Sequence, residues 1–188
     1  MSTRATAAVS PDGAAAPGSS VRYRHLGWDD VQAQAARIAA AVRTDGVPQT
    51  VVAVVRGGMV PAVLLAHQLG VHDVRALEVT HTVDDSANAA KTPEPTVRNP
   101  ASLGGIDGLD VIVVDDVAGT GQALARAVRI VQQAGAARVR SAVLVVNEAN
   151  WTGDRPPGET VTWIGETVRG WVVFPWEASA SAVAEGAS

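Results

Sequence analysis

The sequence predicts an α/β fold built on an open, mostly parallel twisted sheet flanked by helices. Segments with helical apolar periodicity alternate along the chain with short β-branched runs, which is the pattern of such a sheet. The β-branched runs lack polar alternation, as expected of strands buried on both faces. With 188 residues, 47% of them hydrophobic, the chain is long enough for one well-buried core and too short for two large domains.

The first predicted element is a helix that begins within residues 28–32. Asp29 is its expected N-cap, and Gln32, three residues later, is the partner of a capping box. Four apolar residues then follow at helical spacing: Val31, Ala35, Ile38 and Val42. They form one stripe that should lie against the sheet, and Gly46 supplies the stop.

A strand, a helix and a second strand are expected next. Residues 50–55 are a β-branched run, residues 61–69 begin with proline and are closed by Gly70, and residues 74–80 suit another strand. No period is sustained over residues 81–108, so we expect a loop there that exceeds the roughly 12 to 15 residues usual in compact domains.

The second half of the chain repeats the alternation. Residues 111–114 predict a strand, and a helix follows in which Leu124, Val128 and Val131 share a face. Further strands are expected at residues 139–146 and 161–164. Ligands of such sheets bind beyond the carboxyl ends of the strands, so we expect the functional residues in the loops at that edge.

Composition excludes several classes of function. The formal net charge of -4 argues against duplex nucleic acid or an anionic membrane surface as the main partner. The absence of cysteine removes disulfides and thiolate chemistry and makes a cytoplasmic location the expectation. No run approaches the roughly 18 apolar residues of a membrane span. Residues 1–20 and 179–188 are expected to be disordered tails around one domain at residues 21–178.

Two glycine-containing loops follow predicted strands, and both suit an anion. In residues 56–58, Arg-Gly-Gly, the glycines let backbone N–H groups approach a ligand beside a cation, and a helix begins shortly after. Residues 119–121, Gly-Thr-Gly, repeat this arrangement, with the Thr120 hydroxyl as a further donor. Each loop is therefore predicted to bind phosphate or pyrophosphate.

Asp115 and Asp116 stand directly before the second loop. Carboxylates repel phosphate unless another group engages them, and vicinal sugar hydroxyls or Mg²⁺ can do so. The pair therefore indicates a phosphorylated pentose as the ligand. Taken alone, the pair also suits a solvated turn, and Gly119 and Gly121 resemble part of a dinucleotide-binding fingerprint, although there the acid comes about 20 residues later.

Three segments resemble motifs of the type I phosphoribosyltransferases. VIVVDDVAGTGQAL is similar to their phosphoribosyl diphosphate motif, VVAVVRGGMVPA to their pyrophosphate loop, and WVVFPWE to the C-terminal purine-site segment of the xanthine-guanine enzymes. The resemblance runs from Tyr23 to Glu177 and is strongest to the bacterial and archaeal hypoxanthine or xanthine-guanine branch. It implies that family's fold, with a small hood formed by the N- and C-terminal segments, and a homodimer.

The resemblance assigns the donor half of the site. Asp115 and Asp116 would act on the ribose hydroxyls and Mg²⁺, and Arg56 and Gly57 would hold the pyrophosphate, often through a cis peptide in this family. The 5′-phosphate would lie in a loop formed by Ala118, Gly119, Thr120, Gly121 and Gln122. Ala123 departs from the family pattern, because it replaces a hydroxyl residue that commonly caps this phosphate.

The acceptor half departs further. Trp171 would stack on the base with the Val172 backbone at its edge, although a tryptophan here also suits simple closure of the core. Gly119 stands where purine-specific relatives usually carry an acid that handles a purine proton. Asn147 stands where they usually carry a lysine that reads the 6-oxo group, and a neutral amide both donates and accepts.

We therefore predict a phosphoribosyltransferase that moves the 5-phosphoribosyl group from phosphoribosyl diphosphate to a ring nitrogen of a nucleobase or related heteroaromatic acceptor. It would release pyrophosphate and use Mg²⁺. The departures predict an acceptor other than an ordinary 6-oxopurine. Ordinary hypoxanthine, guanine or xanthine salvage is one alternative, and a non-catalytic regulator that binds phosphoribosyl diphosphate is an alternative of another class.

Overall fold

The computed structural model describes residues 22–82 and 91–177, so the expected tails at residues 1–20 and 179–188 lie outside the described residues. In chain order the elements are β1 (Tyr23–His25), α1 (Trp28–Asp45), β2 (Thr50–Val55), α2 (Met59–Leu69), β3 (Asp73–Thr82), β4 (Lys91–Val97), the 3-10 helix η1 (Pro100–Leu103), β5 (Asp110–Ala118), α3 (Gln122–Gln133), β6 (Arg138–Asn147), α4 (Pro157–Thr160), β7 (Trp163–Val168) and β8 (Trp171–Val173). Among the described helices, none combines the length and apolar character that crossing a membrane demands.

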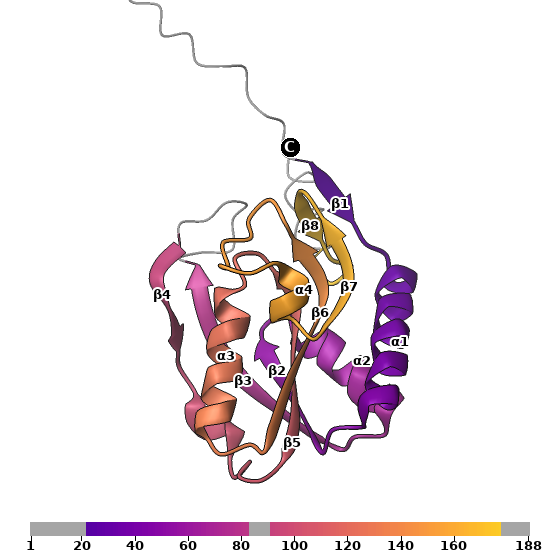
Figure 1. The fold of residues 1–188 in the computed structure, drawn as a ribbon. Coiled ribbons are helices and arrows are strands. Elements are labelled where there is room, and N and C mark those ends of the chain that lie inside the picture. Colours follow the sequence, from indigo (N-terminus) through magenta and orange to yellow (C-terminus); the bar gives the residue numbers. More distant parts are fainter. Residues whose placement is uncertain (1–21, 83–90, 178–188) are drawn as a thin grey trace, which may run out of the picture.

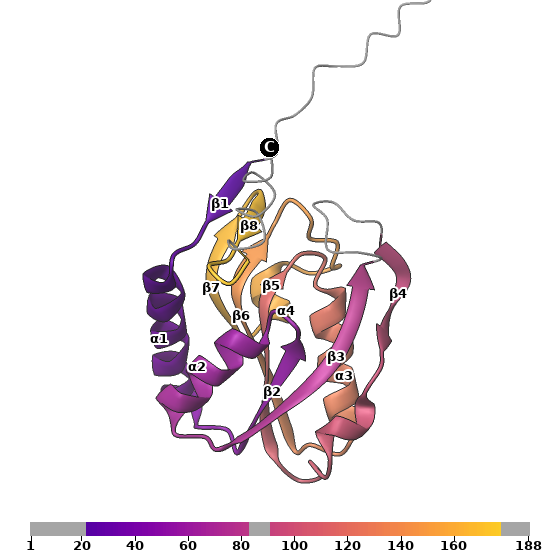
Figure 2. The same ribbon diagram turned by 180° about the vertical axis from the view of Figure 1, so that it is seen from behind.

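The predicted α/β architecture is confirmed. A six-stranded sheet has the order β4-β3-β2-β5-β6-β7, in which β4 runs antiparallel to β3 and the other neighbours are parallel. Helices α1 and α2 cover one face of this sheet and α3 covers the other, as Figures 1 and 2 show from opposite sides. Strand β2 illustrates the packing, because Val51 and Ala53 join the core under α1 and α2 while Val52 and Val54 join the core under α3.

The strand order creates a topological switch point between β2 and β5, the position at which such sheets bind ligands. After β2 the chain passes through α2 on one face to reach β3, and after β5 it passes through α3 on the opposite face to reach β6. The two connections diverge from neighbouring parallel strands, which opens the carboxyl edge of the sheet at this point. The loops that follow β2 and β5 are the two glycine-containing loops predicted to bind phosphate.

A two-stranded parallel sheet forms the expected hood. Strand β1 pairs with β8, with Tyr23 opposite Trp171, and both lie beyond the carboxyl ends of the main strands in Figure 1. The indole of Trp176 stacks on Phe174 with ring centroids 4.6 Å apart and meets Trp28 at 5.9 Å. These rings attach the hood to the start of α1.

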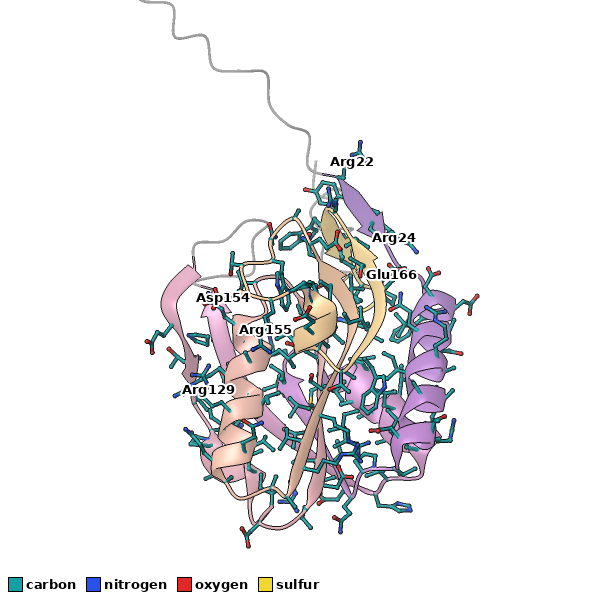
Figure 3. All side chains as sticks on the ribbon, viewed as in Figure 1. Arg22, Arg24, Arg129, Asp154, Arg155 and Glu166 are labelled. Atoms are coloured by element: carbon teal, nitrogen blue, oxygen red, sulfur yellow. The ribbon has the colours of Figure 1, made fainter. Side chains whose placement is uncertain are left out.

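An ion pair also joins the hood to the main sheet. The Nε atom of Arg24 on β1 lies 3.4 Å from a carboxylate oxygen of Glu166 on β7, and Figure 3 shows the two side chains on neighbouring elements. Arg24 is about half exposed, so this pair contributes orientation more than stability.

The start of α1 differs from the prediction. Gly27, not Asp29, is the N-cap, and the Asp30 carboxylate accepts the Gly27 N–H at 2.9 Å in place of the expected Gln32 contact. The two carboxylates near the helix start allow more than one N-cap residue from the sequence alone. A tertiary contact selects Gly27, because the preceding Leu26 is buried and donates its N–H to the Val173 carbonyl of the hood.

The prediction of one long loop over residues 81–108 is wrong in part. Strand β4 and the helix η1 lie within it, and β4 pairs antiparallel with β3. Proline at positions 93 and 95 argued against a strand, but β4 lies at the edge of the sheet, where a missing N–H donor is tolerated. Strand β7 is also displaced, because it begins at Trp163 while Val161 follows the short helix α4.

Candidate functional site

The acid pair and the Arg56 loop meet at the carboxyl edge of the sheet. A Cβ placed on Gly57 would overlap the carboxyl group of Asp116, so that carboxyl lies directly against the Gly57 backbone. The Val55–Arg56 peptide bond at the start of this loop is cis, as the resemblance implied. The structure therefore brings together two sets of residues that are about 60 positions apart in the sequence.

Gly58 makes this close approach possible. A Cβ at Gly58 would collide with the carbonyl oxygens of Val54 and Val114 and would lie 3.0 Å from the Asp115 Cα. The residue therefore lets the turn after β2 lie flat against β5. The sequence showed the glycine, but only the pairing of β2 with β5 shows what it approaches.

The acid pair lies inside β5, not after it as the sequence suggested. Val113 packs under α3 and Val114 under α1 and α2. A strict two-residue alternation would place Val117 under α3 and Ala118 under α1 and α2, but each lies on the opposite face. The pattern thus changes phase at Asp115 and Asp116. The two carboxyls lie close enough for each to alter the pKa of the other.

Both carboxyls are costly to ionise. Burial raises the pKa of Asp115 well above its usual value, and the charge of Asp116 raises it further. Burial likewise raises the pKa of Asp116 to about 6. The Val117 N–H, which donates to the Asp116 Oδ1 at 2.8 Å, lowers this pKa and so opposes part of the effect of burial. Strongly raised pKa values are typical of functional sites, where a cation or hydrogen-bond donors of a ligand can stabilise the carboxylates.

Glu177 was not assigned by the sequence reasoning, although it ends the WVVFPWE segment. Its negative charge contributes to the raised pKa of Asp116, which places the carboxylate near the acid pair. Its Oε2 accepts the Phe174 N–H at 3.0 Å. The end of the hood segment therefore reaches the acid pair. A carboxylate six residues after Trp171 was the available signal in the sequence.

The predicted 5′-phosphate loop joins β5 to α3. Ala118 is the last residue of β5, Gly121 is the N-cap of α3 in the left-handed region with φ 77°, and Gln122 begins the helix. The buried Thr120 accepts the Gln122 N–H through its Oγ1 at 3.4 Å, which leaves its own hydrogen to donate. The first turn of α3 carries no acidic residue, so the helix N-terminus can favour an anion.

Gly119 has space beside it. The nearest atom to a Cβ built there is the Asn150 Cβ at 4.0 Å, which is an ordinary contact. Gly119 also has no positive φ. The glycine is therefore not required by sterics at this position, and its departure from the family pattern concerns chemistry.

The residues predicted to bind the acceptor have fewer contacts with the acid pair. Asn147 ends β6 one position beyond the partner of Ala118 and is buried, but its Oδ1 accepts the Ala149 N–H at 3.1 Å. Trp171 and Val172 lie on β8 of the hood, half-buried and buried respectively. The described contacts do not join Trp171 to the acid pair directly; the link runs through the segment that ends at Glu177.

Other polar and aromatic residues near the acceptor side have structural partners. Glu148 pairs with Arg169 at 3.2 Å. Trp163 lies at the amino end of β7, away from the site, where the Arg140 guanidinium lies 5.4 Å from its ring centroid. Trp151 packs against Gly121 of the predicted 5′-phosphate loop.

The donor set suits Mg²⁺ bound together with a ligand. Within residues 22–82 and 91–177, no three His, Asp or Glu side chains are grouped to hold a metal ion by themselves. Mg²⁺ is commonly held by one or two carboxylates together with substrate phosphate oxygens and water. Asp115 and Asp116 provide such a pair, and burial raises the pKa of both carboxyls.

Comparisons with known proteins agree with this geometry. The family model for the phosphoribosyl transferase domain matches residues 27–181. Xanthine-guanine phosphoribosyltransferases of Gluconobacter oxydans and a Ruegeria species are 28% and 29% identical to this chain, covering 84% and 81% of it and 86% and 84% of their own lengths. A purine phosphoribosyltransferase structure from Pyrococcus horikoshii matches with a TM-score of 0.66 and 28% identity, covering 82% of this chain and 94% of that one. The chain belongs to the phosphoribosyl transferase domain family and is a phosphoribosyltransferase.

Proposed function

We propose that this protein transfers the 5-phosphoribosyl group of phosphoribosyl diphosphate to a ring nitrogen of a purine-like heteroaromatic base. The observation that carries the proposal is the contact between the Asp116 carboxyl and Gly57 at the switch point of the sheet. It joins a carboxylate pair suited to a sugar diol with a loop suited to pyrophosphate. The second glycine-containing loop, at the N-terminus of α3, would bind the 5′-phosphate.

In the proposed reaction the bond between the sugar C1′ and the pyrophosphate oxygen breaks, and its electron pair leaves with the oxygen. The lone pair of the acceptor nitrogen forms the new carbon–nitrogen bond, and the acceptor releases a proton. The chain's role is to hold both phosphates so that C1′ faces the base. Asp115 and Asp116 would orient the ribose hydroxyls and hold Mg²⁺, which when bound would neutralise charge on the departing pyrophosphate.

The acceptor half supports a base other than an ordinary 6-oxopurine. Gly119 offers no side chain to take the acceptor's proton, and a Cβ built there would meet its nearest atom only at 4.0 Å, so a clash at the Cβ does not require glycine. The Asn147 oxygen is used within its own turn, so its amide nitrogen is the group that could meet the base. Trp171 supplies an aromatic face on the hood for stacking.

Ordinary purine salvage is the second candidate. It is favoured by the identity of 28% and 29% to enzymes named xanthine-guanine phosphoribosyltransferases. The test is release of pyrophosphate from phosphoribosyl diphosphate with Mg²⁺ and a panel of guanine, xanthine, hypoxanthine and other nitrogen heteroaromatics. Rapid guanine turnover would refute the altered acceptor. If no base in the panel leads to pyrophosphate release but phosphoribosyl diphosphate still stabilises the fold, a non-catalytic regulator is supported instead.

The acceptor proposal makes a gain-of-function prediction. Gly119→Asp combined with Asn147→Lys should raise kcat/KM for guanine or hypoxanthine by roughly tenfold or more, because it restores a proton acceptor and a cationic donor. Gly119→Ala with Asn147→Gln is the matched control, since it adds bulk at both positions without those groups. Equal rates for the two double variants would show that these positions do not face the acceptor.

The homodimer stays a prediction. Met59 and Val63, one helical turn apart on α2, are exposed apolar side chains at 40% accessibility each. Light scattering on the purified protein gives the oligomeric mass directly.

A further inference from the structure

Trp151 contacts the 5′-phosphate loop from outside. A Cβ built on Gly121 would lie 2.6 Å from both Cη2 and Cζ3 of the Trp151 indole, so the ring lies against the Gly121 backbone. Gly121 is the N-cap of α3 and adopts a left-handed conformation with φ 77° and ψ -9°. The ring therefore supports the residue at which the phosphate loop becomes the helix.

The indole is held in place by its own segment. Its Nε1 donates to the Arg155 carbonyl at 2.8 Å, and Figure 3 shows Arg155 next to α4. Gly153 lets the chain close over the ring, because a Cβ there would lie 2.9 Å from the same Nε1. The half-buried ring also packs against the core under α3. Its orientation is thus determined by contacts that do not involve the phosphate loop.

The same segment begins at the acceptor half of the site. Asn147 accepts the Asn150 N–H through its carbonyl at 3.1 Å and the Ala149 N–H through its side chain. Asn150 in turn is the nearest neighbour of the Cβ position at Gly119. One tight turn therefore faces the phosphate loop at Gly119 and, through Trp151, at Gly121.

A cavity of about 130 Å³ lies beside the ring, lined among others by Gly121, Leu124 and Val128 of α3. Removal of the indole would enlarge this space beside Gly121, because Trp151 and Gly121 both line it. The three atoms nearest to the Cβ position of Gly121 all belong to the Trp151 ring. The ring is thus the closest support of the loop at this residue.

We infer that Trp151 is a positioning residue that holds the phosphate loop in the geometry that binds the 5′-phosphate of the donor. The inference rests on the proposed function of the loop. It concerns one half of the donor only, because Trp151 touches the loop before α3 while the pyrophosphate loop after β2 lies against Asp116. The two phosphates of the donor can therefore be probed separately.

The experiment measures binding of ribose 5-phosphate and of Mg²⁺-pyrophosphate by calorimetry in the wild type, Trp151→Phe and Trp151→Ala. Trp151→Ala is expected to weaken ribose 5-phosphate binding by about tenfold or more, since small displacements of a binding loop cost that much. Trp151→Phe should lie between, because it keeps a ring but loses the bond to Arg155. Pyrophosphate affinity should change by less than about twofold, and the KM for phosphoribosyl diphosphate should rise more than kcat falls.

Trp163→Phe is the matched control, because Trp163 is also a half-buried tryptophan but lies at the amino end of β7. It should leave both affinities unchanged. If the Trp163 and Trp151 variants weaken the binding of ribose 5-phosphate equally, Trp151 is only a packing residue and the inference is overturned. If Trp151→Ala does not fold, Trp151→Phe decides the question alone. Failure of the wild type to bind either probe would refute the proposed function itself, whereas wild-type binding with unaltered Trp151 variants refutes only this inference.

Discussion

Asp116→Asn is expected to lower kcat/KM for phosphoribosyl transfer by at least about 100-fold, because the neutral amide cannot serve a diol and a divalent cation as the carboxylate does. The substitution keeps the shape of the side chain and an oxygen that can accept the Val117 N–H. The loss should therefore reflect charge and not misfolding. The measurement is initial rates of pyrophosphate release with saturating acceptor.

The same variant should be more stable than the wild type at pH 7. The folded-state pKa of Asp116 is about 6 against an ordinary value of 3.8, so between these values the folded protein binds a proton that the unfolded chain has released. The stability of the wild type therefore falls as pH rises from about 4 to about 6. The Asn variant avoids this cost and should gain roughly 1 to 3 kcal/mol at neutral pH.

Urea denaturation at pH 4 and pH 7 checks both predictions: the loss of wild-type stability as pH rises and the higher stability of the variant at pH 7. Asp115 also has a raised pKa from burial, so the variant should keep a reduced pH dependence of the same sign. Asp154→Asn is the control, since Asp154 is exposed and should change neither rate nor stability. A variant that is less stable than the wild type at pH 7 would mean that the surroundings favour the charged carboxylate, which contradicts a pKa raised by burial.

Gly57→Ala should have the second largest effect. Its new Cβ would occupy the position of the Asp116 carboxyl, so either that carboxyl or the loop after β2 must shift. We expect a loss of about 100-fold in kcat/KM for phosphoribosyl diphosphate, because the acid pair and the pyrophosphate loop are then displaced relative to each other. Mg²⁺-pyrophosphate affinity should fall in parallel.

Gly158→Ala on α4 provides the matched control, because its Cβ position has no atom within 4 Å. Its activity should be that of the wild type. The Gly57 variant would argue against the site if it retained full affinity for pyrophosphate. In that case the contact with Asp116 would be incidental to donor binding.

Local pattern identified the elements in the centre of the sheet. The β-branched runs of β2, β5 and β6 must be apolar on both faces, so their strands are visible in the sequence alone. The apolar stripe of α1 was likewise correct, since all four of its residues are buried. Strand β4 was missed because its prolines are acceptable only at an edge, and being at an edge is a property of the whole sheet.

For the site, the sequence by itself determined the chemical groups: two carboxylates, two glycine loops and a tryptophan-containing C-terminal segment. The tertiary structure alone decided that Asp116 lies against Gly57, that Trp151 lies against Gly121, and that the Asn147 oxygen is already bonded within its turn. These are contacts between segments distant in the chain or choices among local hydrogen bonds. Residue type sets what a group can do, but the order of parallel strands sets which groups meet, and no local pattern contains that order.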